Sequence, residues 1–102
     1  MAQRYLHNPF LIDNLKFDLR IYVLVTSVSP LRVFIYKEGL ARFATQDYVA
    51  PLGSNLNNLF MHLTNYAINK ESEDFVQASG TTEDTGHKRS LTAIFRALEL
   101  AR

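Results

Sequence analysis

The stretch KFDLRIYVLV, residues 16–25, decides the fold class of this 102-residue chain. Its odd positions are all apolar, while its even positions are charged as far as Arg20 and apolar from Tyr22 onward. Neighbouring side chains of a strand point to opposite faces, so this alternation predicts a β-strand with one buried face. The second face turns apolar at one end, which suggests that its charged end lies beside a cleft.

Two more strands are predicted downstream of this stretch. Residues 26–30 contain Pro30 and predict a turn, and residues 31–37 alternate again as a second strand. A tight turn is expected at Glu38 and Gly39, where glycine can adopt a positive φ. Residues 40–44 form the third strand of what we expect to be an antiparallel β-meander.

The end of the chain predicts an amphipathic helix over residues 90–102. Ser90 is a plausible N-cap, and apolar residues follow on one stripe: Leu91, Ile94, Phe95 and Leu98. Residues 10–12 fit either a short strand or one buried helical turn. Residues 46–58 predict a loop, and residues 56–61 one helical turn. The expected fold class is therefore α+β.

Composition narrows the possible functions. The chain has 11 Lys and Arg against 10 Asp and Glu, and its formal charge of +1 does not favour nucleic-acid binding. No stretch is long and apolar enough to span a bilayer, no signal peptide is recognisable, and there is no cysteine. These features favour an intracellular, soluble protein without membrane contact. The polar stretch of residues 69–87 is long for a loop, so we expect it to be mobile or held by another segment.

Three groups of polar residues could carry chemistry. Lys16, Asp18 and Arg20 share one face of the predicted strand, either as a solvated face or as a polyphosphate site. Arg42 would lie across from Ile35 if the turn has two residues, or on the Tyr36 face if it has an odd number.

The third group is HLTN, residues 62–65, outside regular structure. Thr64 and Asn65 could cap nearby backbone groups, with a satisfied loop histidine beside them, or could bind a ligand. The three histidines do not have the spacing of metal ligands, and the four glycines form no phosphate loop.

Four segments in the same order resemble the tubulin–tyrosine ligase-like family, whose catalytic core has an ATP-grasp fold. They are QRYL (residues 3–6), KFDLR (16–20), YKEGLARF (36–43) and HLTNYAINK (62–70). The resemblance runs from residue 3 to about residue 98. Residues 69–70, 75–76 and 88–91 are most similar to the polyglutamylase branch.

The resemblance implies a ligase that uses ATP and Mg²⁺ to activate a carboxylate as an acyl phosphate, which an incoming amino acid attacks. It implies an adenine hinge at Gln3, Arg4 and Leu6, and a ribose and phosphate wall at Lys16, Asp18 and Arg20. By the same resemblance, Arg42 faces the terminal phosphate. Thr64 and Asn65 hydrogen-bond the nucleotide from the far side. Arg20 and Arg42 are the expected catalytic residues, and no metal ligand is assigned.

The family core is several times longer than this chain. We therefore expect residues 1–102 to be its central nucleotide-binding part, a partial ATP-grasp domain that lacks the phosphate loop and the magnesium ligands and is inactive alone. The expected partners are tubulin tails and glutamate, in the cytoplasm, on the cytoskeleton and at the cilium or basal body. A tubulin glycylase, a tyrosine ligase or a non-catalytic microtubule-associated module are the alternatives.

Overall fold

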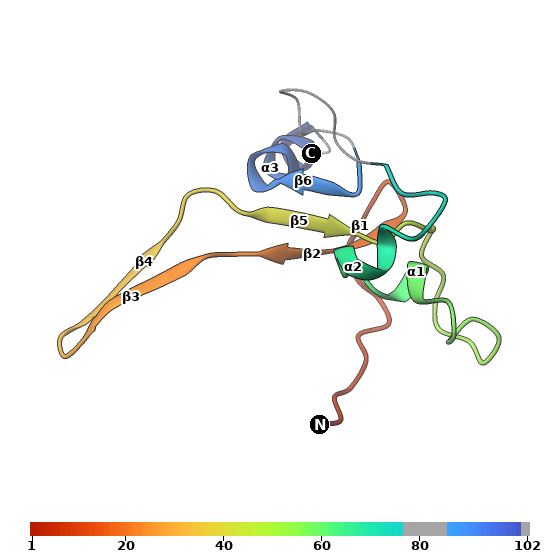
Figure 1. Ribbon diagram of the computed structural model, residues 1–102, viewed down its shortest axis with the longest axis horizontal. Coiled ribbons are helices and arrows are strands. Elements are labelled where there is room, and N and C mark those ends of the chain that lie inside the picture. Colours follow the sequence, from red (N-terminus) through yellow and green to blue (C-terminus); the bar gives the residue numbers. More distant parts are fainter. Residues whose placement is uncertain (77–85, 101–102) are drawn as a thin grey trace.

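The computed structural model describes residues 1–76 and 86–100, and its α+β composition agrees with the sequence-based expectation (Figure 1). Antiparallel strands dominate the chain, and a helix ends the described part. The strands are β1 (Leu11–Ile12), β2 (Leu15–Arg20), β3 (Val23–Val28), β4 (Leu31–Ile35), β5 (Leu40–Phe43) and β6 (Lys88–Ser90). The helices are α1 (Leu59–His62), α2 (Tyr66–Asn69) and α3 (Leu91–Leu100).

The strands β2 to β5 form one long hairpin. The strand predicted over residues 16–25 is interrupted at residues 21–22, and its two parts have different partners. β2 pairs with β5, with Arg20 opposite Leu40, and β3 pairs with β4, with Val23 opposite Ile35. The predicted pairing of the second strand with the third is therefore wrong, since both pair with the first.

The expected turn at Glu38 and Gly39 does not reverse the chain. β4 and β5 both run antiparallel to the first half of the hairpin, so residues 36–39 connect two strands that continue in one direction. Gly39 does not have the expected positive φ, because Gly86 is the one described glycine that does. A Cβ at Gly39 would instead lie 2.5 Å from the carbonyl oxygen of Arg20, so the glycine permits a close approach of two backbones.

The hairpin base belongs to a four-stranded sheet in the order β1-β2-β5-β6. Residues 11–12 are the short strand of the two alternatives left open by the sequence, and they pair with β2. β6 pairs with β5, and α3 starts directly after it. The predicted N-cap is confirmed, because the backbone N–H of Ala93 donates to Ser90 Oγ over 3.1 Å.

A small hydrophobic core lies between this sheet and α3. Its buried centre consists of Ala41, Phe43 and Ile94, and partly buried side chains pack around it: Ile12, Leu15, Phe17 and Leu98. Leu91 and Ile94 of the predicted helical stripe are buried, whereas Phe95 is 52% exposed. The predicted apolar stripe is therefore only partly buried, because the described residues cover only part of the helix surface.

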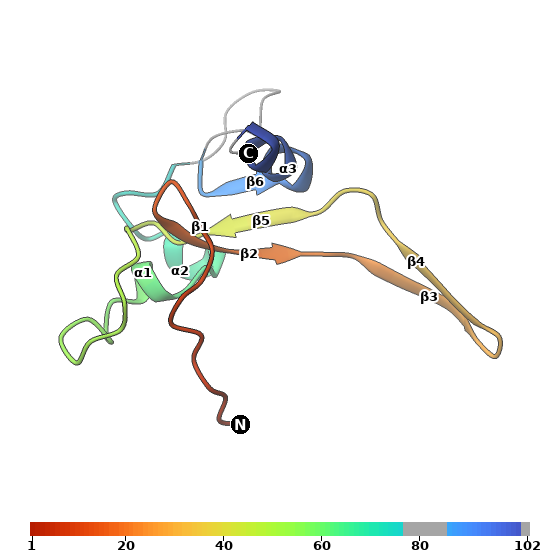
Figure 2. The ribbon, with the colours of Figure 1, turned by 180° about the vertical axis from the view of Figure 1, so that it is seen from behind.

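The other half of the hairpin, β3 and β4, projects away from the sheet (Figure 1). Figure 2 shows from behind that α3 and β6 lie along β5 and do not reach the hairpin tip. The apolar side chains of β3 and β4 are exposed on both faces, including Val25 at 52% and Phe34 at 57%. The buried face that we predicted for residues 16–25 is therefore wrong beyond Phe17 in the described structure.

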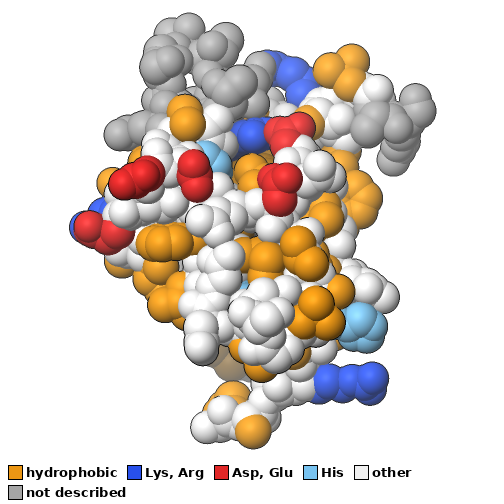
Figure 3. Space-filling model, turned by 90° about the vertical axis from the view of Figure 1, so that its right-hand side faces the viewer, with side chains coloured by type: hydrophobic (Ala, Val, Ile, Leu, Met, Phe, Trp, Pro, Cys, Tyr) orange, Lys and Arg blue, Asp and Glu red, His pale blue; other side chains and the backbone are white. Residues whose placement is uncertain are grey.

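The two short helices lie beside the base of the hairpin. The predicted loop over residues 46–58 contains no helix or strand, and the helical turn predicted at residues 56–61 is α1, slightly later in the chain. Figure 3 views the side of the molecule on which α1 and α2 lie, where acidic and hydrophobic side chains are interspersed. Much of the polar stretch predicted to be mobile, residues 77–85, lies outside the described residues. Within the described ranges, no helix is long and apolar enough to cross a membrane.

Candidate functional site

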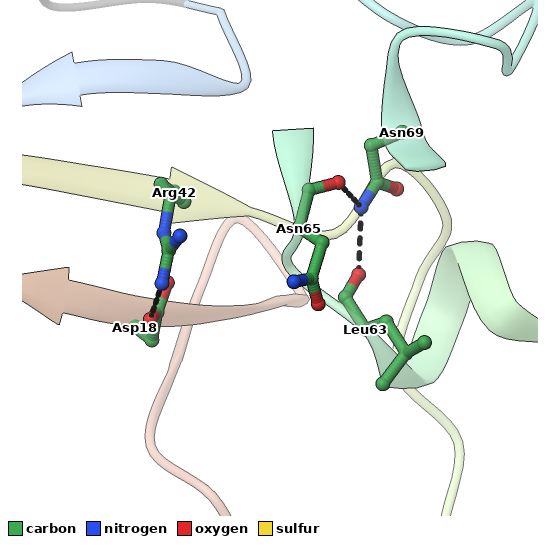
Figure 4. Close-up of polar contacts among 5 residues, drawn as sticks. All are labelled: Asp18, Arg42, Leu63, Asn65 and Asn69. Carbon is green, nitrogen blue, oxygen red and sulfur yellow. Dashed lines mark hydrogen bonds and ion pairs between the residues drawn. The ribbon is translucent and has the colours of Figure 1, made fainter. Parts of the chain in front are cut away.

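Arg42 and Asp18 face each other across the base of the hairpin. They are register partners of β5 and β2, and Arg42 Nε donates to Asp18 Oδ1 over 3.0 Å. A second bond joins Arg42 Nη2 to Asp18 Oδ2, so the carboxylate holds the guanidinium at two points (Figure 4). Both positions expected from the sequence for Arg42, opposite Ile35 or on the Tyr36 face, are wrong, because the register places it opposite Asp18.

This ion pair leaves part of the guanidinium free. The two bonds use Nε and Nη2, and Nη1 makes no hydrogen bond within residues 1–76 and 86–100. The side chain of Arg42 is 23% exposed and that of Asp18 40%, so the pair is accessible to a ligand. The hydrogen bonds to Asp18 raise the pKa of Arg42 above its ordinary value. A fixed, charged guanidinium with three unused N–H donors, two of them on Nη1, is suited to bind a phosphate oxygen.

Lys16 lies on the same strand face as Asp18 and borders a cavity. The cavity has a volume of about 800 Å³ and is lined by residues 3–10 together with Lys16 and Phe17. Of the residues expected at the nucleotide, Gln3, Arg4 and Leu6 thus share one cavity with Lys16. The cavity is large enough for a nucleotide base and ribose.

A hydrogen-bond chain that the sequence did not predict fixes one wall of this cavity. Lys16 Nζ donates to the Tyr5 hydroxyl over 3.3 Å and lies 4.6 Å from the centre of its ring. His62 Nε2 lies 3.0 Å from the carbonyl oxygen of Asn55, which can only accept, so Nε2 carries the proton. The other ring nitrogen, Nδ1, therefore accepts from the Tyr5 hydroxyl over 2.8 Å.

The buried His62 is thus the satisfied histidine that the sequence left as one alternative, although it ends α1 and is not in a loop. A second tyrosine supports the same wall, because the Tyr48 hydroxyl donates to the carbonyl oxygen of His7 over 2.9 Å. Burial raises the pKa of Tyr48 to about 12, so this hydroxyl keeps its proton at neutral pH. No sequence signal identified either tyrosine, since both lie outside helices and strands.

Arg20 is one of five predicted site residues that do not line the cavity, the others being Asp18, Arg42, Thr64 and Asn65. It is the exposed last residue of β2, opposite Leu40, and it does not line the cavity. Its side chain has no hydrogen bond or ion pair with the described part of the chain. The alternation of the strand still places it on the face of Lys16 and Asp18.

Thr64 and Asn65 lie between α1 and α2. Asn65 occupies the N-cap position of α2, but its side chain makes no capping hydrogen bond, and Figure 4 shows it without a polar partner among the residues drawn. The Asn65 carbonyl instead accepts from the backbone N–H groups of Ile68 and Asn69. The capping alternative is therefore wrong for Asn65, and its side chain is available to a ligand.

The described residues hold no candidate metal centre. Within residues 1–76 and 86–100, no group of three His, Cys, Asp or Glu side chains is arranged to hold an ion. Asp18 is committed to Arg42, and Asp13 accepts from Arg89 Nη2 over 3.0 Å. The polar groups described above are suited to bind an anion and a neutral ligand surface.

Comparison of the sequence with known proteins indicates the family of this chain. Residues 1–102 match the model of the tubulin-tyrosine ligase family. Tubulin polyglutamylase ttll6 of Danio rerio is 57% identical over 99 residues, which are 97% of this chain and 12% of the relative. Tubulin polyglutamylase TTLL13 of Mus musculus is 55% identical over 94 residues, 92% of this chain and 11% of the relative.

A third relative comes from another organism. The probable beta-tubulin polyglutamylase of Tetrahymena thermophila is 50% identical over 100 residues, 97% of this chain and 8% of the relative. The chain thus spans about a tenth of the length of these curated relatives.

Proposed function

We propose, because this chain belongs to the tubulin-tyrosine ligase family, that it supplies ATP-binding residues of an enzyme that joins glutamate to tubulin. The similar proteins from three organisms all carry the name tubulin polyglutamylase, which favours glutamate over glycine or tyrosine as the added amino acid. The enzyme acts on tubulin tails, and its place is therefore the cytoplasm and the cytoskeleton, including the cilium and basal body.

The observation that carries this proposal is the Arg42 guanidinium, held at two points by Asp18 with Nη1 unused. In such a ligase, the terminal phosphoryl group of ATP passes to a tubulin carboxylate and ADP leaves. The amino nitrogen of glutamate then attacks the acyl carbon, loses a proton and displaces inorganic phosphate. Negative charge accumulates on the phosphoryl oxygens during transfer, so a cation fixed beforehand lowers the barrier.

The remaining residues have binding roles in this proposal. Gln3, Arg4 and Leu6 hold the adenine in the cavity they share with Lys16, and the Lys16 ammonium contacts the phosphates. Thr64 and Asn65 donate or accept hydrogen bonds from the side of α2. Arg20 adds a second cation at the end of β2. In this proposal, all of these groups contact one side of ATP.

None of these residues is assigned to Mg²⁺ in this proposal. Asp18 is paired with Arg42, and the described residues contain no cluster of carboxylates for a divalent cation. In this proposal the carboxylates that hold Mg²⁺ beside the phosphates belong to the rest of the catalytic domain. The roles proposed for the described side chains do not include binding a metal.

We also infer that residues 1–102 act as the central part of a larger catalytic domain. The apolar side chains of β3 and β4 are exposed on both faces, and such surface is normally covered in a soluble protein. The chain also spans only 8% to 12% of the relatives named above. Residues 1–102 alone are then expected to be inactive.

The test is glutamate incorporation into microtubules by the full-length protein that carries this chain, with Mg²⁺ and ATP. We expect labelled glutamate to be incorporated, and labelled glycine or tyrosine not to be. Preferential incorporation of glycine or tyrosine would contradict the choice of amino acid. Absence of all three would favour a non-catalytic microtubule-associated module.

A second measurement tests the inference about the larger domain. Calorimetric titration of residues 1–102 with Mg·ATP should give no saturable binding at micromolar concentrations, because ATP needs donors on several sides. Each missing charged contact costs about 1.5–3 kcal/mol. Micromolar binding would show that this chain is a self-sufficient nucleotide-binding module.

A further inference from the structure

Asn69 is a polar side chain enclosed at the end of α2. It is 1% exposed and is among the three largest fully buried side chains of the described residues. A buried amide must have its donors and its acceptor satisfied, or it destabilises the fold. The role of the Asn69 side chain therefore follows from its three hydrogen-bond partners.

Two of these groups lie on either side of Thr64. Asn69 Nδ2 donates to the carbonyl oxygen of Leu63 over 2.7 Å and to that of Asn65 over 3.2 Å (Figure 4). One amide group thus holds the backbone immediately before and after Thr64. α2 has only four residues, too few to be stable as an isolated helix, so this segment depends on tertiary contacts for its conformation.

The third group connects Asn69 to the strand that carries Arg42. Thr45, two residues after β5, is 5% exposed and donates its hydroxyl proton to Asn69 Oδ1 over 2.9 Å. The two carbonyl oxygens fix the orientation of the amide, since a reversed amide would place Oδ1 against them, and the Thr45 hydroxyl therefore donates to Oδ1. Thr45 N–H also donates to the Phe60 carbonyl oxygen of α1 over 2.9 Å.

We propose that Asn69 is a positioning residue that sets the location of Thr64 and Asn65 relative to Arg42. This inference rests on the proposed function, in which Thr64 and Asn65 bind ATP. The side chains of Thr64 and Asn65 have no hydrogen bond of their own with the described residues. Their positions are set through the backbone, and Asn69 holds that backbone from inside.

The main experiment is Asn69→Asp in the full-length protein. The substitution keeps the size and the acceptor for Thr45 but places a carboxylate oxygen against the carbonyls of Leu63 and Asn65. We expect the KM for ATP to rise by roughly tenfold, the scale of losing two neutral hydrogen bonds. Activity is expressed per folded molecule, determined from the amplitude of the unfolding transition.

Asn58→Asp is the matched control. Asn58 is a half-buried asparagine whose Nδ2 also donates to an oxygen, Gln46 Oε1, over 2.7 Å, and it does not contact residues 63–65 through its side chain. The KM for ATP should stay within about twofold of the original value, because substitutions near the surface and away from a binding site change the stability of a protein only slightly. Should Asn69→Asp fail to fold, Thr45→Val tests the same inference, since it removes the hydrogen bond that links Asn69 to the segment after β5.

A double-mutant cycle with Thr64→Val separates this inference from the proposed function. If Asn69 acts through Thr64, combining Asn69→Asp with Thr64→Val should weaken ATP binding hardly more than the single substitution that has the larger effect on it. If Thr64→Val weakens ATP binding while folded Asn69→Asp and Thr45→Val leave the KM unchanged, Asn69 is only a structural residue and this inference is wrong. If Thr64→Val itself has no effect, the ATP-binding role proposed for Thr64 is wrong, and the role of Asn69 is wrong with it.

Discussion

The base and the tip of one hairpin share the strand pleat but differ in the burial of their side chains. In the base, Phe17 of β2 and Phe43 of β5 stack with ring centres 5.2 Å apart, and Phe43 is 1% exposed. In the tip, Phe34 of β4 alternates with its neighbours in the same way but is 57% exposed. β6 pairs with the edge of β5 and α3 packs on the base, whereas no described element covers the tip.

The difference shows what alternation encodes. A period of two follows from the pleat of a strand, which the base and the tip share. Burial depends on whether another element lies against the face, and that is a property of the tertiary structure. The base carries the candidate site because its covered strands can hold Asp18 and Arg42 in register.

The largest expected difference is in stability, between Phe43→Ala and Phe34→Ala. In residues 1–102, Phe43→Ala should lower the free energy of unfolding by about 3–5 kcal/mol, since it removes a buried ring. Phe34→Ala should change it by about 0.5 kcal/mol or less, as for an exposed side chain. Urea unfolding of both variants measures this. Equal costs would mean that the tip is covered, for example by a second molecule.

Repeating this pair in the full-length protein sharpens the comparison. There the larger domain that we propose would cover the tip, so the cost of Phe34→Ala should approach that of Phe43→Ala. A cost that stays near zero would contradict the proposed covering of β3 and β4.

The second largest expected difference is in turnover. It separates Arg42→Ala at the base from Arg32→Ala at the tip. In the full-length protein, Arg42→Ala should reduce turnover by roughly 100-fold or more, the effect of losing one preorganised donor to the transition state. Melting temperature should hardly change, because a partly exposed ion pair contributes less than about 1 kcal/mol. Arg32→Ala should leave both unchanged. Near-normal turnover of Arg42→Ala in the glutamylation assay would remove Arg42 from the site.

A smaller effect is expected where base and tip join. Gly39→Ala places a Cβ 2.5 Å from the Arg20 carbonyl oxygen, a backbone atom that cannot move without shifting β2. We expect a loss of about 1–3 kcal/mol in the free energy of unfolding. Gly53→Ala is the control, because a Cβ there meets no atom within 4 Å. If both variants unfold at the same urea concentration, the close approach at Gly39 has no energetic importance.

The smallest effect concerns Glu38, next to this junction. Its carboxylate accepts from Gly39 N–H over 3.0 Å, and from the backbone N–H and the hydroxyl of Thr92 in α3. The hydrogen bond from the Thr92 hydroxyl, followed by that from Gly39, lowers the pKa of Glu38 from its ordinary value of 4.5.

A lowered folded-state pKa means that Glu38 stabilises the fold fully above pH 4.5 and that this contribution is lost as pH falls through the lower, folded value. We therefore expect Glu38→Gln to melt earlier than the unchanged protein at neutral pH, with a gap that closes under acidic conditions. Melting curves across this range are the measurement. A gap that does not depend on pH would mean that the charge of Glu38 has no part in holding α3.

Local sequence patterns led to the candidate residues and to one part of their arrangement. The order of the four family-like segments assigned nine candidate residues, and the alternation of residues 16–20 placed Lys16, Asp18 and Arg20 on one face. The features of the site that the sequence did not predict depend on contacts between segments that are far apart in the chain. Tyr5 meets His62 and Lys16, and Asn69 meets Thr45, so no spacing within one segment could have identified them.

By itself, the sequence determined the α+β class, the extended conformation of residues 16–20, 31–35 and 40–43 and the start of α3, because pleat, helical period and the Ser90 cap act within a few residues. Only the tertiary structure decided that β5 returns to β2, that Asp18 therefore meets Arg42, and which apolar faces are covered. A meander and a long hairpin present the same period of two, so register and pairing follow from packing between strands that are far apart in the chain.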